Sequence, residues 1–253
     1  MILTPDFVFI HQPKTGGTFV TRALYRLLNE PAGRADPKEP IVETNKHGTC
    51  REIPVSHSGI PILAAVRNPF ERYVSQYEFA WWKRDLPPWV DMEAVRSRYP
   101  HYPDLSFEEF VTGSEVLLQR HRNSALPPER RLGLQSEQFV RFFFRQPEVF
   151  AEIDDCYLEE RRFEADLFPV VFLRTHRLNQ DLHDYLIAVG FEPDRVRFIL
   201  DESRVRPPGH PLEGENRNWS AGHGWSDYYT PTLQQFVKTR ERLLLAMFPE
   251  FDT

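Results

Sequence analysis

The sequence predicts an α/β fold in which helices cover both faces of a central parallel sheet. Short apolar runs rich in β-forming residues are typical of buried strands, and stretches with apolar residues at helical spacing lie between them. Alternation of strand and helix along a chain is the pattern of a parallel sheet. The chain is long enough for one such domain over residues 1–253, or at most two small ones.

The expected elements follow one another in a regular order. Buried strands are predicted at residues 7–10, 60–66 and 170–173, and residues 41–43 are a weaker candidate for a further strand. Amphipathic helices are predicted at residues 18–28, 70–82, 107–112, 138–144, 178–189 and 231–248. Segments with many prolines or polar residues are predicted loops, namely residues 29–40, the aromatic-rich residues 85–104 and residues 203–224.

Composition excludes several classes of protein. The formal net charge of −6 argues against a general nucleic-acid binder. The two cysteines make neither a disulfide framework nor a zinc site. We expect no membrane span, because no run approaches the roughly 18 apolar residues that one needs. We also expect no signal peptide, because Pro5 and Asp6 interrupt the first apolar run and no basic region precedes it. A soluble, cytoplasmic protein is therefore expected, with a luminal domain cut from its anchor as the open alternative.

The loop after the first predicted strand has the composition of a phosphate-binding loop. Its sequence is PKTGGT, residues 13–18. Glycines let the backbone approach a ligand closely, and the free N–H groups of the following helical turn can bind an anion. The loop differs from a Walker A motif, because Lys14 precedes the glycines and no acidic residue ends a later strand to hold magnesium. A plain strand-to-helix turn is the structural alternative.

A second candidate anion site follows the strand predicted at residues 60–66. Arg67 comes directly after this strand, and Ser75 lies about two turns into the next helix. In parallel sheets, ligands bind beyond the carboxyl ends of the strands. A guanidinium and a hydroxyl at that edge can converge on one phosphate. Taken alone, Arg67 would equally suit a salt bridge, and Ser75 a helix surface.

Together, the two segments resemble the sulfotransferases that use 3′-phosphoadenosine 5′-phosphosulfate (PAPS). The branch is the one that includes heparan-sulfate O-sulfotransferases and bacterial carbohydrate sulfotransferase-like proteins. The matching strings are HQPKTGGT at residues 11–18 and RNPFERYVSQY at residues 67–77. Shorter matches are KHGTCREI at 46–53, LRTHRLNQD at 173–181, where His176 replaces a commoner acid, and YYTPTL at 228–233. Residues 78–133 match nothing in the family pattern, and we expect this excursion to lie on the acceptor side.

The resemblance implies a P-loop-like three-layer sandwich and sulfuryl transfer from PAPS. Lys14 would be catalytic, because its charge can stabilise the phosphate oxygen of the leaving PAP. The transferred sulfuryl group carries less charge than a phosphoryl group, so no metal is expected to be required. Carried over position by position, the expected donor-binding residues are Lys14, Thr15, Gly16, Gly17, Thr18, Arg67 and Ser75.

His47 is the predicted general base. A neutral imidazole can accept the proton of an acceptor hydroxyl, and His47 follows a predicted strand at the edge of the sheet where Lys14 lies. Glu43 is the rival base, because some relatives use a carboxylate. A surface histidine is the structural alternative for His47. His57 has no support from the family pattern, and His11 is predicted to be structural.

Other functions and contacts stay open. A P-loop nucleotide kinase or NTPase is disfavoured by the order of lysine and glycines, and a non-catalytic PAP- or PAPS-binding module by the presence of both Lys14 and His47. The branch favours a saccharide or glycoconjugate acceptor, with a lipid or secondary metabolite as alternatives. The Phe142–Phe144 run is expected in the core. Further candidate contacts are Trp81, Trp82 and Trp89 for the acceptor and Arg217, Asn218 and Trp219 for the nucleotide.

Overall fold

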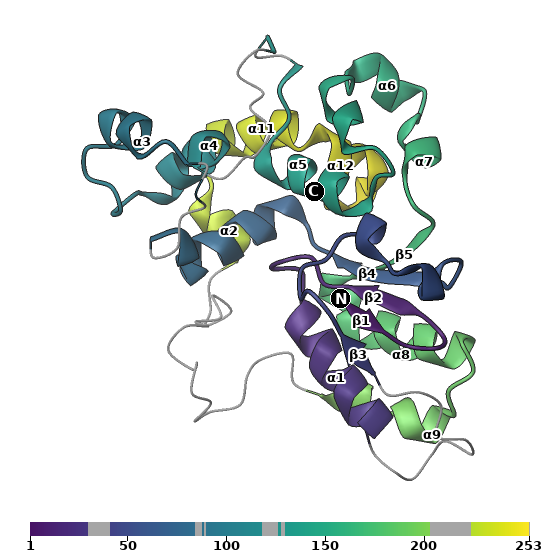
Figure 1. Cartoon of the computed structure of the whole chain (residues 1–253). Helices are drawn as coiled ribbons and strands as arrows, with labels where there is room; N and C mark the ends of the chain where they lie inside the picture. The colour runs from purple at the N-terminus through teal and green to yellow at the C-terminus, as the bar shows by residue number, and fades with distance from the viewer. Residues whose placement is uncertain are drawn as a thin grey trace. The chain divides into compact units, whose positions relative to one another are not determined.

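The computed structural model describes residues 1–29, 41–83, 88, 90–117, 126–127, 130–202 and 224–252. They form two compact units. The first unit holds the sheet and comprises residues 1–67, 142–145 and 167–213. The second is helical in its described part and comprises residues 68–141, 146–166 and 214–253. Figure 1 gives the element labels used below.

A mixed five-stranded sheet in the order β3-β1-β2-β4-β5 is the centre of the first unit. Its strands are β1 (Ile2–Leu3), β2 (Val8–Ile10), β3 (Val42–Glu43), β4 (Ile62–Val66) and β5 (Val170–Arg174). Strands β2, β4 and β5 are parallel, in a register that pairs Val8 with Ile62 and Ile62 with Val170. The predicted α/β class is confirmed, and the apolar runs at residues 7–10, 60–66 and 170–173 form its parallel strands.

The expectation of a purely parallel sheet is wrong at one edge. Strand β1 runs antiparallel to both β2 and β3. The reason is the short connection between β1 and β2, which permits only a hairpin. The Thr4 backbone N–H donates to the carbonyl of Phe7 at 3.1 Å, and the Phe7 N–H donates back to Thr4 Oγ1 at 2.9 Å. This closed turn lets Ile2 pair with Phe9.

Helices cover one face of this sheet. Helix α1 (Gly17–Asn29) and helix α8 (Leu178–Ala188) pack their apolar stripes on it (Figure 1). The short helices α9 (Pro193–Val196) and α10 (Phe198–Asp201) pack against α8 and add Val196 and Ile199 to the same core. Phe9, Leu63, Ala65 and Leu173 supply the sheet's side of this core. On the opposite face, the Phe143 ring contacts Phe172 edge-on.

The second unit is built on helices around an aromatic core. The first half of the chain contributes the helices α2 (Pro69–Phe79), α3 (Met92–Arg98) and α4 (Phe107–Leu117). The second half of the chain contributes α6 (Asp155–Glu159), α7 (Phe163–Asp166), α11 (Pro231–Arg240) and α12 (Arg242–Met247). Helix α5 (Leu134–Phe143) begins in this unit and ends in the first. Rings of Phe70, Trp82, Phe107, Phe110 and Tyr229 form the centre of its core.

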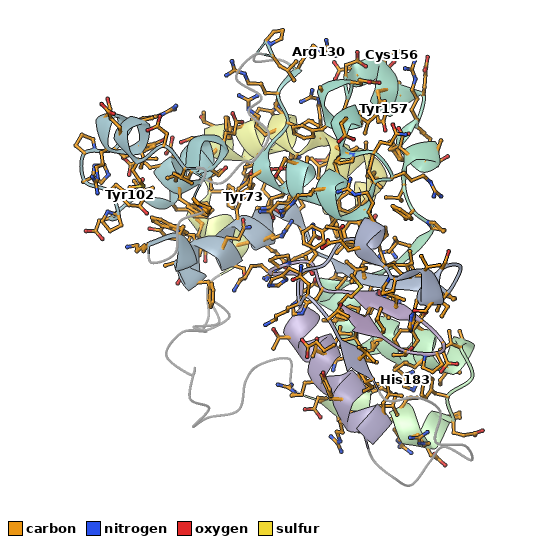
Figure 2. The ribbon with its side chains drawn as sticks, viewed as in Figure 1. Tyr73, Tyr102, Arg130, Cys156, Tyr157 and His183 are labelled. Atoms are coloured by element: carbon orange, nitrogen blue, oxygen red, sulfur yellow. The ribbon has the colours of Figure 1, made fainter. Side chains whose placement is uncertain are left out.

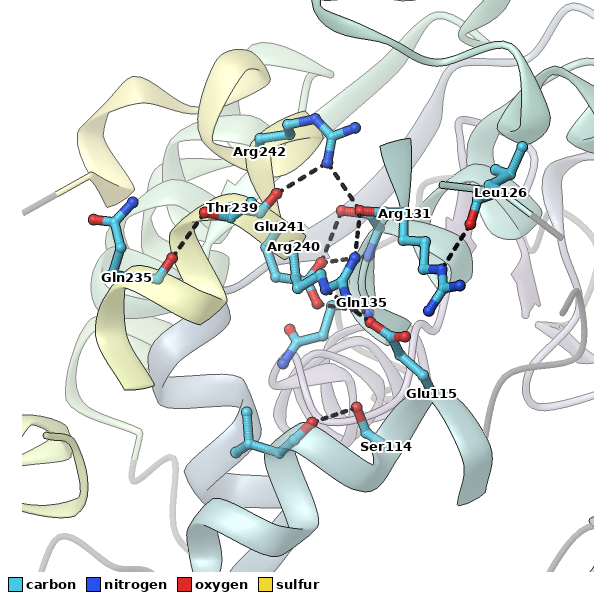
Figure 3. Close-up of polar contacts among 12 residues, drawn as sticks. Ser114, Glu115, Leu126, Arg131, Gln135, Gln235, Thr239, Arg240, Glu241 and Arg242 are labelled. Atoms are coloured by element: carbon cyan, nitrogen blue, oxygen red, sulfur yellow. Dashed lines mark hydrogen bonds and ion pairs between the residues drawn. The ribbon is translucent and has the colours of Figure 1, made fainter. Parts of the chain in front are cut away.

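Glu241 is a fully buried carboxylate that joins three helices of the second unit. Its oxygens accept from the Tyr73 hydroxyl on α2 and from Gln135 and Ser136 at the start of α5. Figure 3 shows Glu241 beside Gln135. Gly133 makes room for the carboxylate, because a Cβ there would lie 2.0 Å from Glu241 Oε1. The carboxylate therefore caps α5 from a distant part of the chain.

This contact explains why the closing helix is broken. We predicted one helix over residues 231–248, but α11 ends at Arg240 and α12 begins at Arg242. Glu241 lies between them with a φ of −101° and a ψ of 22°, outside ideal helical geometry. The backbone leaves the helical conformation at this residue, because the buried carboxylate must point inward to reach its hydrogen-bond donors.

Two other expectations need correction. The helix predicted over residues 70–82 ends at Phe79, because Ala80 takes a left-handed conformation and closes it with hydrogen bonds to Gln76 and Tyr77. The segment 85–104, predicted as a loop, contains α3, and the Asp91 carboxylate accepts from the backbone N–H groups of residues 93 and 94 at its start.

The described part of the unmatched excursion contributes several side chains to the core of the second unit. Trp82 is fully buried, and Tyr102 donates its hydroxyl to the Trp82 carbonyl at 2.7 Å (Figure 2). All three phenylalanines of the 142–144 run are buried, as predicted. The side chains of Trp81 and Trp89 lie outside the described residues, as do the candidate contacts Arg217, Asn218 and Trp219. Of the loops predicted at 29–40 and 203–224, residues 30–40 and 203–223 also lie outside them, and Asn29 is the last residue of α1. Within the described part, no helix combines the length and apolar character needed to cross a membrane.

Candidate functional site

The loop of residues 13–18 joins β2 to α1 with an unusual backbone. Lys14 has a φ of 65° and Gly16 a φ of 91°. A positive φ is uncommon in a residue other than glycine, and such conformations concentrate at ligand-binding sites. The buried Thr15 hydroxyl donates to the Gln12 carbonyl at 2.9 Å and ties the loop to itself. Helix α1 then begins at Gly17, so the last loop amides belong to its first turn.

Both glycines of the loop are in close contact with neighbouring side chains. A Cβ at Gly17 would lie 2.1 Å from Cδ2 of the His11 ring, and one at Gly16 would lie 2.5 Å from Cδ2 of Leu178 on α8. Only a residue without a side chain fits either position. The loop is therefore packed against α8 on one side and against His11 on the other.

His11 is a buried histidine at the end of β2. Burial lowers its pKa to about 3, and the neighbouring His47 and Lys46 add to the effect. Its ring is therefore neutral near pH 7 and packs beside the backbone at the start of α1. This placement agrees with the structural role predicted for His11.

The depressed pKa of His11 predicts acid sensitivity of the fold. The unfolded chain takes up a proton below the ordinary histidine pKa of about 6.5, whereas the folded chain takes it up only near pH 3. This site should therefore lower the free energy of unfolding by about 2 kcal/mol between pH 7.5 and pH 5. Urea unfolding at both pH values measures the loss. In His11→Asn the loss should be smaller by about that amount, and an equal loss in both proteins would contradict the assignment.

His47 lies beside His11 and is oriented by its backbone. The Nδ1 atom of His47 is 2.9 Å from the carbonyl oxygen of His11, and the two rings are edge-on with centroids 5.1 Å apart. A carbonyl only accepts, so the proton of the neutral His47 ring is on Nδ1. The lone pair is then on Nε2. His47 itself is exposed, which is what a residue that meets an external hydroxyl requires.

The turn around His47 is held by short-range hydrogen bonds. The His47 N–H donates to Asn45 Oδ1 at 3.2 Å. Beyond it, the Thr49 N–H donates to Glu52 Oε2 at 2.7 Å, as in a capping box, and this bond lowers the pKa of Glu52. These contacts give a physical reason for the threonine and the glutamate of the 46–53 string.

Glu43, the rival base, is in a different setting. It lies on β3 and its Oε2 atom accepts the hydroxyl of Tyr25 from α1 at 2.8 Å. Accepting this bond raises the pKa of Tyr25, because the phenol proton is shared with a carboxylate. Glu43 is exposed, and one of its oxygens is engaged by a phenol within the protein.

Arg67 follows β4 directly and is half-buried. Thr175, at the turn after β5, places its Oγ1 atom 2.9 Å from the carbonyl of Val66 and 2.9 Å from the carbonyl of Thr15. The first unit thus brings together the 13–18 loop, His47 and the strand end that carries Arg67. Ser75 is half-buried on α2 and belongs to the second unit.

Sequence reasoning missed two residues of this region. In the sequence, Thr175 is only one position of the 173–181 string, and no pattern marks a threonine that binds two distant carbonyls. Asp181 ends the same string, and its carboxylate accepts from the Arg174 N–H at 2.8 Å and pairs with Arg177 Nε at 3.1 Å. An acidic residue seven positions after a strand end is the signal that could have identified Asp181 as the acceptor for the Arg174 N–H.

Comparison with known proteins places the sequence pattern in a family. Residues 4–139 match the model of the family described as "Sulfotransferase family", which is more than half of the chain. Among solved structures, the chain is similar to mouse sulfotransferase SULT7A1 complexed with PAP, at 15% identity and a TM-score of 0.45, over 95% of this chain and 83% of that one. No curated protein sequence matches.

Proposed function

Because the chain belongs to the sulfotransferase family, we propose that it transfers a sulfuryl group from PAPS to an acceptor hydroxyl. The family model covers segments of both compact units, and we propose that both belong to one sulfotransferase domain. PAPS as the donor is what the resemblance of residues 11–18 and 67–77 implies. The assignment of each residue to a step is part of the proposal.

One observation carries the proposal: His11 links the candidate base to the candidate phosphate loop. Its carbonyl engages Nδ1 of His47, and its ring packs against Gly17 where α1 begins. A single residue therefore fixes both His47 and the end of the loop that carries Lys14. General-base and charge-stabilising groups need such fixed mutual positions, because catalysis depends on prearranged geometry.

In the proposed reaction, His47 accepts the proton of the acceptor hydroxyl on Nε2. The hydroxyl oxygen forms a bond to sulfur as the bond between sulfur and the 5′-phosphate oxygen breaks. That oxygen gains the negative charge, and Lys14 stabilises it. The amides of Thr15 to Thr18 bind the 5′-phosphate at the start of α1. The products are PAP and a sulfated acceptor.

The 3′-phosphate distinguishes PAPS from common adenine nucleotides. We propose Arg67 as its main partner, because a guanidinium binds phosphate through paired hydrogen bonds. Ser75 stays the motif's second candidate for this phosphate. The proposed mechanism uses no metal ion, since Lys14 supplies the charge at the leaving oxygen.

A saccharide or glycoconjugate is the proposed acceptor, on the branch that the motifs resemble, and a lipid or secondary metabolite is the alternative. We also propose a cytoplasmic location, since Cys50 and Cys156 are both free thiols.

Incubation of the chain with isotope-labelled PAPS and a panel of hydroxyl acceptors, read by mass spectrometry, tests the activity. Labelled sulfuryl on an acceptor supports the proposal. Tight PAPS binding with no transfer would favour a binding module, and magnesium-dependent ATP hydrolysis would favour an NTPase.

A further inference from the structure

Thr175 occupies a turn that contacts both candidate phosphate-binding loops. The sheet order puts β4 between β2 and β5. Thr175 follows β5, and its Oγ1 atom lies 2.9 Å from the Val66 carbonyl at the end of β4 and 2.9 Å from the Thr15 carbonyl after β2. A threonine hydroxyl has one proton, which is shared between the two carbonyls. The contact thus spans three neighbouring strand ends.

The position of Thr175 is itself fixed by its surroundings. The preceding residue, Arg174, donates its N–H to Asp181 Oδ2 at 2.8 Å, which closes the turn onto α8. Leu178, in the first turn of α8, packs against Gly16 in the phosphate loop. The hydroxyl therefore comes from a rigid turn, and the two carbonyls that it binds are held at a fixed separation.

We infer that Thr175 is a positioning residue that holds the 5′-phosphate loop and the Arg67 strand end in register for a nucleotide with two phosphates. This inference rests on the proposed function. Thr15 is in the loop assigned to the 5′-phosphate, and Val66 directly precedes Arg67, which is assigned to the 3′-phosphate. A hydroxyl that joins their backbones sets the distance between the two subsites.

This role has a signature that a purely structural role lacks. A ligand with both phosphates gains affinity because binding at one loop places the second phosphate at the other loop, as for any two-point attachment. The gain depends on the separation of the loops. A nucleotide with a single phosphate uses one loop and is insensitive to that separation. Loss of Thr175 should therefore weaken PAP selectively.

The test is titration calorimetry of PAP, 5′-AMP and 3′-AMP with the full chain and two variants. Thr175→Val keeps the shape and removes the hydroxyl, and Thr175→Ser keeps the hydroxyl and is the matched control. We expect Thr175→Val to weaken PAP about tenfold, with both mononucleotides changed less than about threefold. Thr175→Ser should retain PAP affinity. If Thr175→Val does not fold, Thr175→Ala provides the same comparison.

The outcomes distinguish a failure of the positioning role of Thr175 from a failure of the proposed function. An equal loss for all three nucleotides in Thr175→Val, or no loss for PAP, would overturn the positioning role while the wild-type preference for PAP stands. A loss in Thr175→Ser as large as in Thr175→Val would also overturn it, because the hydroxyl is then not the active group. If the wild-type chain binds PAP no better than 5′-AMP, the proposed function fails, and the inference fails with it.

Discussion

Lys14→Ala is expected to lower kcat for sulfuryl transfer by about a hundredfold or more. That is the scale seen when one prearranged charge donor is removed from a site where negative charge develops. Binding of PAP should weaken less than turnover, because part of the Lys14 contact strengthens only as the phosphate oxygen gains charge. Steady-state kinetics and titration calorimetry on the same variant measure the two effects.

Lys238→Ala is the matched control for this variant. Lys238 lies on α11 and pairs with Asp252, so its removal takes away one lysine charge outside the 13–18 loop. The control should keep wild-type kcat. A Lys14→Ala variant that keeps near-normal kcat and loses only PAP affinity would show that Lys14 binds the donor without acting on the leaving group.

His47→Ala is expected to lose roughly a hundredfold or more in kcat while PAP affinity stays near the wild-type value. This is the usual contribution of a general base. The activity of the wild-type protein should fall toward acidic pH, because a protonated imidazole cannot accept a second proton. Initial rates over a pH series, with PAP titrations as the binding check, provide the measurement.

Three further variants separate the base from its neighbours. His47→Asn can still donate to the His11 carbonyl but lacks Nε2, so it should be as inactive as His47→Ala. Glu43→Gln should have a smaller effect, because Glu43 is engaged with Tyr25. His57→Ala should be close to wild type. An inactive Glu43→Gln beside an active His47→Ala would reverse the assignment.

The parallel part of the fold could be predicted because its strands are continuous apolar runs. Strands β2 and β4 are buried along their whole length, and the edge strand β5 is buried at Phe172 and Leu173. Strand β1 could not, since Ile2–Leu3 is too short to show a period, and its antiparallel pairing is set by the turn at Thr4. Helix α3 was not predicted, because the prolines on both sides of it are typical of a loop. Asp91 is nevertheless a recognisable N-cap residue for this helix.

Tertiary contacts account for most of what the sequence could not reveal. The break at Glu241 depends on donors from Tyr73 and α5, which no local pattern encodes. In the candidate site, motifs in the sequence are enough to select the 13–18 loop and His47 as candidates. Their partners were not, because His47 is oriented by a backbone carbonyl and Thr175 binds two more. Every residue has a backbone carbonyl, so the residue type does not show which carbonyl will accept a side-chain hydrogen bond.

Titration of the wild-type chain with PAP and with 5′-AMP tests the central claim most directly, since the two ligands differ only in the 3′-phosphate. The account predicts that PAP binds at least about tenfold more tightly, the effect of one or more charge-assisted hydrogen bonds. Arg67→Ala should lose most of this preference, while the exposed Arg51→Ala control keeps it. Equal affinities of the wild-type chain for PAP and 5′-AMP would contradict the account.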